Sequence, residues 1–540
     1  PPVYTAPGYY LCRNSETFYR VAYEHKHCGI NSSQPHFGIC RLPAVKLILH
    51  SAAIEVISSR LLNKFSGRTE IIMEKKALLK VMALLTAAVL ALSAAGCGGD
   101  GGTVTSGGEN SNTPAKTNIS DIEMPTADLS GNSKILKVFG WSTMAENNTD
   151  GEAAEYFKKE FGVTLDETVS THETYWQDLA KMVAAGNSPD VVDLSYDKFF
   201  PTPLTGGLLD SWDGIIDFNT PLWSDTKELT ESMKWKGKVY YPIISDFMTS
   251  WFYYNKNMFR NYGLEDQNPR TLWEKGEWTM DKMIELSDQF IEKNNKNEVT
   301  QYGFTVQNLE LLSMTGEQIV EIKGGTEYVN NIKSSKIAKV MNSMYKISGA
   351  GTGSFTTLDA CPVFEQEKCA MLLSSATLTL ETRFADLREK DALGFAPMPK
   401  LDNETPQYVE AAVDPGYGLV KGAQNVELAT LWVNYLKWFR LGENFCVQVP
   451  ISEETPAKQR YGLKAKAGSA ALSEEDIAFI NKYLESKPEK VYCTYRSIVR
   501  NMGDLSTFKW DFFSGKSQWS AVVQEIYPRY ETQLKKWVKE

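Results

Sequence analysis

The chain has 540 residues, a hydrophobic fraction of 42% and a formal net charge of −10 at pH 7. The acidic balance argues against a nucleic-acid partner, because binding to phosphate backbones needs clustered lysine and arginine side chains. The composition is that of a soluble globular protein, and the length is enough for two domains with full hydrophobic cores.

Residues 1–72 contain no methionine, although they hold four of the five histidines of the chain. The segment that follows has the pattern of a secretory signal, which must stand at or near an N-terminus to be used. We therefore expect residues 1–72 to be upstream sequence read in frame and not a domain. Their Cys and His residues match no zinc-binding spacing, and we expect no metal site and no cofactor.

Residues 73–97 read MEKKALLKVMALLTAAVLALSAAGC, in which early lysines precede an apolar run and small residues lead to a cysteine. This order is typical of a secretory signal, and the apolar run is too short to span a membrane. The segment resembles a bacterial lipoprotein signal with its lipobox, although Ala94 stands where that pattern prefers leucine. The resemblance implies that residues 73–96 are a signal peptide and that Cys97 is lipidated, which would anchor the protein to the extracytoplasmic side of the cell membrane.

Residues 97–133 follow as a lipidated cysteine and a stretch rich in Gly, Ser, Thr and Asn. We expect this stretch to be a flexible tether, because it has too little apolar content to fold. As a flexible coil it would span on the order of 30 Å.

The folded part begins with alternating strand and helix patterns. Strands are expected at 134–141, 163–168 and 190–194, and helices at 151–161 and 175–185. Alternation of this kind predicts an α/β protein with a mostly parallel sheet flanked by helices.

Several longer stretches occur in a fixed order behind the signal and the tether. They read YWQDLAKMVAAGNSPDVVDLSYDKF, GGLLDSW, GKVYYPIISDFMTSWFYYNKNMFRNYGL, PVFEQEKCAMLLSS, LGFAPMPK and GYGLVKGAQNVELATLWVNYLKWF. Taken in this order, residues 134–439 are similar to the family 1 extracellular solute-binding proteins of ABC importers, the maltose-binding-protein type.

The resemblance implies a periplasmic-binding-protein type II fold with two α/β lobes. One lobe would hold residues 134–246 and about 405–440, and the other residues 247–404 and about 441–540. The chain would cross between them near 245–250, 399–408 and 441–450. It also implies a monomeric binder whose partners are a small-molecule solute and the permease subunits of the transporter.

Catalysis has little support in the residues after the signal. His172 is the only histidine there, so a site with two or three histidine ligands is impossible. Paired carboxylates among Asp210, Asp213 and Asp217 leave a secreted glycoside hydrolase as an alternative, and the same fold with a peptide, polyamine or metal complex as ligand is another. Cys361, Cys369, Cys446 and Cys493 permit disulfides, and their pairing does not follow from the sequence.

Aromatic side chains at strand ends favour a sugar as the solute, because sugars offer apolar faces for stacking and hydroxyl groups for hydrogen bonds. Ligands of open α/β sheets bind beyond the carboxyl ends of strands. We therefore predict these ligand-binding residues: Trp141, Ser142, Tyr196, Asp197, Lys198, Asp246, Trp251, Ser374, Ser375, Arg383, Asp414 and Tyr417. By the resemblance, Asp197 and Lys198 match the acidic and basic pair of sugar-binding relatives. Leu194 stands where those relatives have tryptophan, so stacking of the maltose kind is not expected there.

Overall fold

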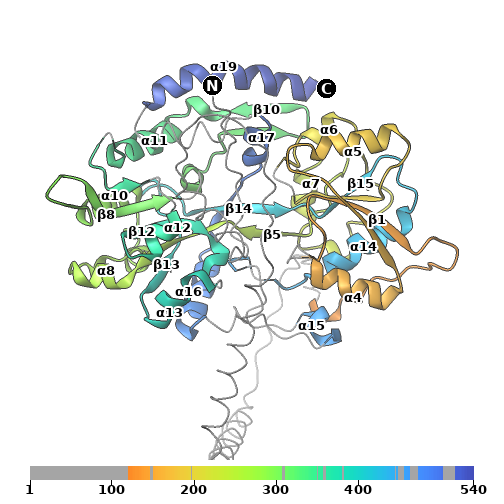
Figure 1. Cartoon of the computed structure of the whole chain (residues 1–540), viewed down its shortest axis with the longest axis horizontal. Helices are drawn as coiled ribbons and strands as arrows, with labels where there is room; N and C mark the ends of the chain where they lie inside the picture. The colour runs from red at the N-terminus through yellow and green to blue at the C-terminus, as the bar shows by residue number, and fades with distance from the viewer. Residues whose placement is uncertain are drawn as a thin grey trace, which may run out of the picture. The chain divides into compact units, whose positions relative to one another are not determined.

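The computed structural model of the chain describes residues 119–145, 150–195, 198–306, 310–349, 351–356, 360–379, 382–443, 445–447, 455–461, 472–502 and 517–539. All of them belong to one compact unit, 113–540. The predictions for residues 1–118, including the signal peptide and Cys97, lie outside the described residues. Strands of this unit form two large sheets with a smaller sheet between them (Figure 1).

The first large sheet has the strand order β2-β1-β3-β15-β4. Its strands are β1 (Ile135–Gly140), β2 (Thr164–Val169), β3 (Val191–Asp193), β4 (Leu209–Asp210) and β15 (Tyr417–Val420). The strands expected at 134–141, 163–168 and 190–194 are confirmed. Strand β1 pairs in parallel with β2 and β3, whereas β15 is antiparallel to β3 and β4. The sheet is therefore mixed and not mostly parallel.

The second large sheet has the order β11-β8-β12-β6-β13, with β7 added beside β8. Its strands are β6 (Ser250–Asn255), β7 (Glu292–Lys293), β8 (Val299–Val306), β11 (Phe355–Thr356), β12 (Cys369–Ser375) and β13 (Leu393–Ala396). Strand β8 is parallel to β11 and β12, and β6 is antiparallel to β12 and β13. Strand β6 is buried at every position, as expected for a strand covered on both faces.

A three-stranded sheet lies between the large sheets, in the middle of Figure 1. Strand β14 (Tyr408–Asp414) is antiparallel to β5 (Ser245–Met248) and parallel to β16 (Glu489–Tyr492). We call β5 and β14 the crossing strands, because β5 leads into β6 of the second sheet and β14 leads into β15 of the first. Strand β5 lies within the predicted crossing at 245–250, whereas β14 begins only at residue 408, where the predicted crossing at 399–408 ends. The division of the chain into lobes stays a prediction.

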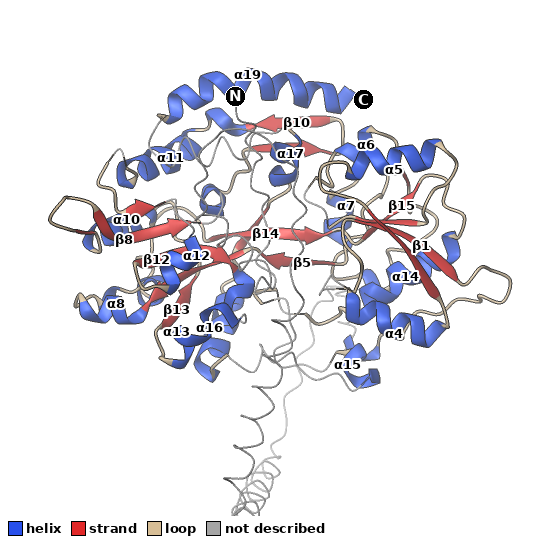
Figure 2. Ribbon diagram, viewed as in Figure 1, coloured by secondary structure: helices blue, strands red, loops and turns tan. Residues whose placement is uncertain are grey.

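Helices cover the faces of the large sheets (Figure 2). They are α4 (Gly151–Phe161), α5 (Tyr175–Ala184), α6 (Thr202–Thr205), α7 (Lys227–Ser232), α8 (Lys256–Asn261), α9 (Pro269–Glu274), α10 (Met280–Gln289), α11 (Ser335–Ile347), α12 (Ala360–Glu365), α13 (Ala385–Glu389), α14 (Val426–Phe439), α15 (Pro456–Tyr461), α16 (Glu474–Glu485), α17 (Tyr495–Asn501) and α19 (Trp519–Lys539). The remaining strands β9 (Val320–Lys323) and β10 (Glu327–Asn330) form a hairpin. Short 3-10 helices lie at Ile119–Asp121, Pro221–Trp223, Glu265–Gln267, Glu310–Thr315, Asn331–Lys333, Ala376–Thr379 and Thr382–Phe384.

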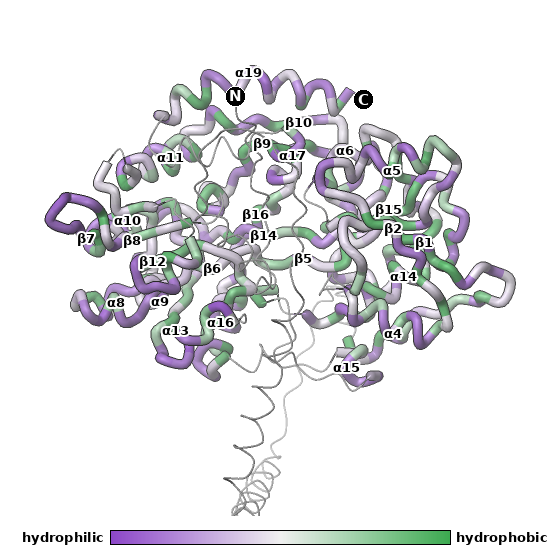
Figure 3. Tube along the Cα trace, in the orientation of Figure 1, coloured by the Kyte–Doolittle hydropathy of each residue, from purple (hydrophilic) through white to green (hydrophobic). Residues whose placement is uncertain are grey.

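Outer helices are amphipathic, as shown by α19, where hydrophilic and hydrophobic stretches alternate along the tube (Figure 3). Its buried residues are Trp519, Ile526, Tyr530, Leu534 and Trp537. Helix α14 is different, because it buries residues on most of its circumference in the core of the first sheet. The helices expected at 151–161 and 175–185 are confirmed as α4 and α5.

The tether predicted for residues 97–133 is wrong for its last part. Leu129 is buried, and Ile119, Ile122 and Met124 pack against the core of the first sheet. The indole nitrogen of Trp438 donates to the carbonyl of Ile122 at 3.1 Å. These spaced apolar side chains bury enough surface to dock residues 119–133 on α14 and its neighbours.

Cys361, Cys369, Cys446 and Cys493 form no disulfide in the structure. Burial raises the pKa of the Cys369 thiol to about 12, and that of Cys446 to about 12 as well. Thiols of this kind are unreactive, because the thiolate is the nucleophilic form.

Candidate functional site

The carboxyl ends of strands from both large sheets meet the crossing strands. At the end of β3, Asp193 pairs with Tyr417, and the amide of Leu194 donates to the carbonyl of Gly416 at 3.0 Å. At the end of β12, Ser375 pairs with Ser250, and the amide of Ala376 donates to the carbonyl of Thr249 at 3.0 Å. The ends of β3 and β12 therefore lie against the segments that join the crossing strands to the large sheets.

Trp141 follows the end of β1 and is half-buried. Its indole nitrogen donates to Oγ of Ser195 at 3.0 Å, and its ring lies 5.1 Å from the ring of His172 between centroids. Burial lowers the pKa of His172, and Lys198 and Arg500 act in the same direction while Glu173 opposes them. The ring of Trp141 is thus fixed in orientation and partly open to solvent, which suits stacking against an apolar ligand face.

Polar residues, among them Ser142 and Lys198, lie close to Trp141 in the sequence or follow the neighbouring strand β3. Ser142 is half-buried, and its hydroxyl oxygen is inaccessible to solvent without a hydrogen-bond partner among the described residues. Lys198 is half-buried, and its carbonyl accepts a hydrogen bond from the indole of Trp176 at 2.9 Å. Tyr196 and Asp197 lie outside the described residues, so their part in the site stays a prediction.

Asp193 connects Trp141 to the interior. The Asp193 carboxylate accepts a hydrogen bond from the amide of Ser195 at 2.7 Å and another from the Ser195 hydroxyl. Ser195 can therefore accept from Trp141 and donate to Asp193 at once. Burial, opposed by these hydrogen bonds and helped by the nearby Asp414, raises the pKa of Asp193 to about 6.

The crossing strands carry Asp246 and Asp414. Asp246 forms an ion pair with Lys490 at 2.6 Å and accepts a hydrogen bond from the hydroxyl of Tyr492 at 2.9 Å. Asp414 accepts from the amide of Gly416 at 2.9 Å and pairs with Arg440. Gly416 has φ +60°, and an added Cβ would lie 2.7 Å from Ile244, so the turn between β14 and β15 requires glycine.

Tyr417 is buried, with 1% of its surface exposed. Its hydroxyl donates to Oδ2 of Asp150 at 3.0 Å, and its ring packs edge-on against Trp432 at 5.6 Å. Both Asp150 and Tyr417 belong to the interior, so Tyr417 acts on the site through the crossing strands and not through a ligand contact in this conformation.

Trp251 and Ser374 are also interior residues, and we leave them out of the proposed ligand contacts. Trp251 is 0% exposed and lies 5.0 Å from the ring of Phe395 and 5.4 Å from that of Tyr483. Ser374 is 0% exposed on the neighbouring strand, with its hydroxyl 3.7 Å from the sulfur of Cys361. Phe479 and Tyr483 of α16 pack on this face of β6, so the position at a crossing did not bring the Trp251 side chain to the surface.

Ser375 and Arg383 are half-buried near the end of β12. The Ser375 hydroxyl lies 2.9 Å from that of Thr377, and its carbonyl accepts from the hydroxyl of Tyr253 at 2.8 Å. Arg383 forms an ion pair with Glu365 at 2.6 Å. These two residues stay candidate ligand contacts from the second sheet.

Sequence reasoning missed three members of the buried network, namely Asp150, Asp193 and Arg440. Asp150 precedes α4 at its N-cap position, and Arg440 follows α14 at its C-cap position. Acidic and basic residues are common at those two positions because they match the helix dipole, so the sequence held no signal that sets this pair apart.

Three other features of the described part of the chain concern metal sites, depressions and membrane-spanning helices. No group of three or more His, Cys, Asp or Glu side chains there could hold a metal ion. A depression of 440 Å³ lies between Asp121, Pro221 and Asn434, and none of its lining residues is a predicted ligand contact. No helix among the described residues is long and apolar enough to cross a membrane.

Comparison with known proteins gives one family. The model of the family described as bacterial extracellular solute-binding protein matches residues 143–437. This range contains both crossing strands, β2, β3, β4 and β15 of the first sheet and every strand of the second sheet, whereas β1 and Trp141 precede it. No curated protein matches the sequence.

Solved structures share the fold at low identity. The ABC substrate-binding protein Lmo0181 of Listeria monocytogenes, in complex with cycloalternan, is 16% identical, with a TM-score of 0.53 over 75% of this chain and 99% of that one. The GacH receptor of Streptomyces glaucescens, solved unliganded and with acarbose, is 14% identical, with a TM-score of 0.52 over 75% and 99% of the two chains. The maltose/maltodextrin-binding domain MalE of Bdellovibrio bacteriovorus, bound to maltotriose, is 15% identical, with a TM-score of 0.50 over 74% and 100%. The fold is thus the α/β periplasmic-binding-protein fold.

Proposed function

Because this chain belongs to the bacterial extracellular solute-binding proteins, we propose that it captures an oligosaccharide and delivers it to the permease of an ABC importer. The family binds solutes and does not convert them, so the glycoside hydrolase alternative is set aside. The observation that carries the choice of a sugar is the half-buried ring of Trp141, held by Ser195 and His172 at the end of β1. The similar structures that hold cycloalternan, acarbose and maltotriose support the same class of ligand.

Ligand contacts are proposed on both large sheets. Trp141 would stack against a sugar ring, with Lys198 and the neighbouring Tyr196 and Asp197 bonding to hydroxyl groups. The Ser142 hydroxyl is covered in this conformation and would not reach the ligand. Ser375 and Arg383 would complete the site from the second sheet. Asp246, Asp414 and Tyr417 would set the position of the crossing strands between them.

Anchoring is a further part of the proposal. Residues 73–96 would be removed as a lipoprotein signal, and lipid on Cys97 would hold the protein at the extracytoplasmic face of the membrane, close to its permease. The spacer would be shorter than residues 97–133, because residues 119–133 pack on the folded unit.

Thermal melting of the purified protein with maltotriose, cycloalternan and acarbose tests the ligand class. A ligand present at 100 times its Kd should raise stability by about 2.7 kcal/mol and raise the melting temperature. Trp141→Ala should weaken binding of the active sugar by about 1–3 kcal/mol, measured by titration calorimetry. Trp273→Ala is the matched control, because Trp273 is also half-buried but lies on α9.

Three outcomes separate the alternatives. Unchanged melting with every sugar, together with stabilisation by a peptide or a polyamine, would overturn the choice of sugar but leave the family assignment. Equal affinities of Trp141→Ala and the control would place the site elsewhere. Recovery of shortened sugars after incubation would contradict capture without conversion.

A further inference from the structure

A buried excess of carboxyl groups surrounds one guanidinium group where β14 leaves the crossing sheet. Arg440, with 3% of its side chain exposed, pairs with Asp414, lies 2.9 Å from Glu443 and lies 4.0 Å from Oδ1 of Asp150. Burial would lower the pKa of Arg440, but Glu443, Asp414 and Asp150 together raise it above its usual value. Arg440 is therefore always charged, so a change of protonation in this cluster must occur on a carboxyl group.

Asp150 is the carboxyl group of this cluster whose negative charge is least offset by hydrogen bonds. It is 6% exposed, its Oδ1 has no hydrogen-bond partner among the described residues, and its Oδ2 has only the hydroxyl of Tyr417. The described groups that act on it are Asp414 on β14, Arg440 after α14, Asp193 at the end of β3 and Tyr417 on β15. Two of these are negative and one is positive, so ionising Asp150 adds a further negative charge to a buried, already acidic group.

We propose that Asp150 is a proton switch on the crossing strand β14. With Asp150 protonated, Arg440 forms its ion pair with Asp414 without competition from Asp150, and this ion pair holds the end of β14 in place. With Asp150 ionised, its Oδ1 competes with Asp414 for the same Nη1 of Arg440, which weakens the hold on β14 and on the turn at Gly416. Because β14 leads through the turn at Gly416 into β15 and is paired with β5, loosening its end frees the crossing between the two large sheets.

The pH range of the switch follows from the surroundings of Asp150. Burial, helped by Asp414 and opposed by Arg440, raises the pKa of Asp150 to about 7. The folded protein therefore holds a proton between about pH 4 and pH 7 that the unfolded chain has lost, so this group's contribution to stability falls as pH rises through that range. Above about pH 7 both states are ionised and the contribution is constant.

Thermal melting of Asp150→Asn between pH 5 and pH 8, without ligand, tests the switch. Asparagine imitates the protonated acid, so the melting temperature of the variant relative to that of the unsubstituted protein should rise by more than about 2 °C from pH 5 to pH 8. Asp217→Asn is the control, because the Asp217 side chain is exposed and its difference should not change over this range. A difference for Asp150→Asn that stays constant with pH would overturn the proposal.

Two further measurements keep the test independent of folding defects. Tyr417→Phe removes the hydroxyl that favours the ionised form of Asp150, so the pH at which the melting curve bends should move upward, and a downward move would count against the switch. Hydrogen exchange at pH 8 should be faster for the amides of β14 in the unsubstituted protein than in Asp150→Asn, and equal at pH 5. Equal exchange at both pH values would contradict the link to β14. None of these measurements uses a ligand, so their failure leaves the proposed function untouched.

Discussion

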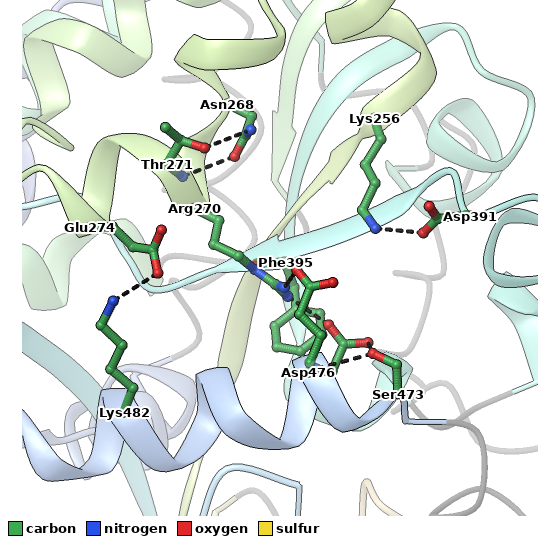
Figure 4. A network of polar contacts seen from close by, with 11 residues as sticks. Lys256, Asn268, Arg270, Thr271, Glu274, Asp391, Phe395, Ser473, Asp476 and Lys482 are labelled. Atoms are coloured by element: carbon green, nitrogen blue, oxygen red, sulfur yellow. Dashed lines mark hydrogen bonds and ion pairs between the residues drawn. The ribbon is translucent and has the colours of Figure 1, made fainter.

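At the scale of single residues, Arg270 shows how a buried charge can hold a core together. It is 8% exposed and lies between the rings of Phe395 and Phe479, at 4.7 and 4.2 Å from their centroids. Its guanidinium donates to the carbonyl of Phe395 at 3.2 Å and to Asp476 at 2.7 Å (Figure 4). The same two rings pack against Trp251, which explains why that tryptophan belongs to the core.

Arg270→Ala should lower the free energy of unfolding by about 3 kcal/mol, because it leaves Asp476 without its buried partner and removes the contact with both rings. Arg270→Lys should recover only part of this loss, since an ammonium group cannot stack and bond in the same way. Denaturant unfolding measures both. Arg260→Ala, at an exposed ion pair with Glu265, is the control and should cost less than about 0.5 kcal/mol. Equal losses at the two positions would refute this account of Arg270.

At the scale of elements, Asn425 joins the start of α14 to the first strand. Its Oδ1 accepts from the amide of Leu428 as the N-cap, and its Nδ2 donates to the carbonyls of Ser133 and Ile135 at 2.7 and 3.2 Å. Its own amide donates to the buried carboxylate of Asp190 at 2.8 Å. The Asn425 side chain thus fixes the position of the start of α14 relative to the start of β1.

Asn425→Ala should cost about 2–3 kcal/mol, of which about 1 kcal/mol is the lost cap and the rest the lost bonds to β1. Asn425→Ser keeps a capping oxygen and should recover only the capping part. Ser473→Ala, which removes the exposed cap of α16, is the control for a cap alone and should cost about 1 kcal/mol by denaturant unfolding. If Asn425→Ala lowered the free energy of unfolding no more than Ser473→Ala, the hydrogen bonds to β1 would not stabilise the fold.

At the scale of the whole molecule, the proposed lipid on Cys97 would keep the protein attached to the membrane. Cys97→Ser should move it from the membrane fraction to the soluble fraction of cells, because the acyl chains supply the affinity for the bilayer. Fractionation followed by immunoblotting measures the change. Cys493→Ser, at a free cysteine of the folded unit, should leave the protein in the membrane fraction. Retention of Cys97→Ser in that fraction would show that another part of the chain anchors it.

Prediction from sequence succeeded where the signal is local. Helices α4 and α5 and strands β1, β2 and β3 follow from periodicity, and the order of longer stretches indicated the family and its fold. Trp141 was placed correctly at a strand end because that position depends only on where β1 stops. Ser375 and Arg383 lie near the end of β12 for the same reason.

Other features depended on contacts between residues far apart in the chain, which no single stretch contains. Residues 119–133 look like a tether in sequence, but Ile122 meets Trp438 and joins the core. Trp251 looks like a groove residue, but Phe395 and Tyr483 enclose it.

By itself, the sequence determined the fold class and the family, and it predicted the strand ends at which a ligand would bind, because these depend on local pattern and composition. Only the tertiary structure decided which side chains point into the interior and which carboxyl groups share Arg440. Burial and charge proximity are properties of the packed chain: Asp150, Asp414 and Arg440 come from three distant segments, and their charges act on one another only after folding removes the water between them.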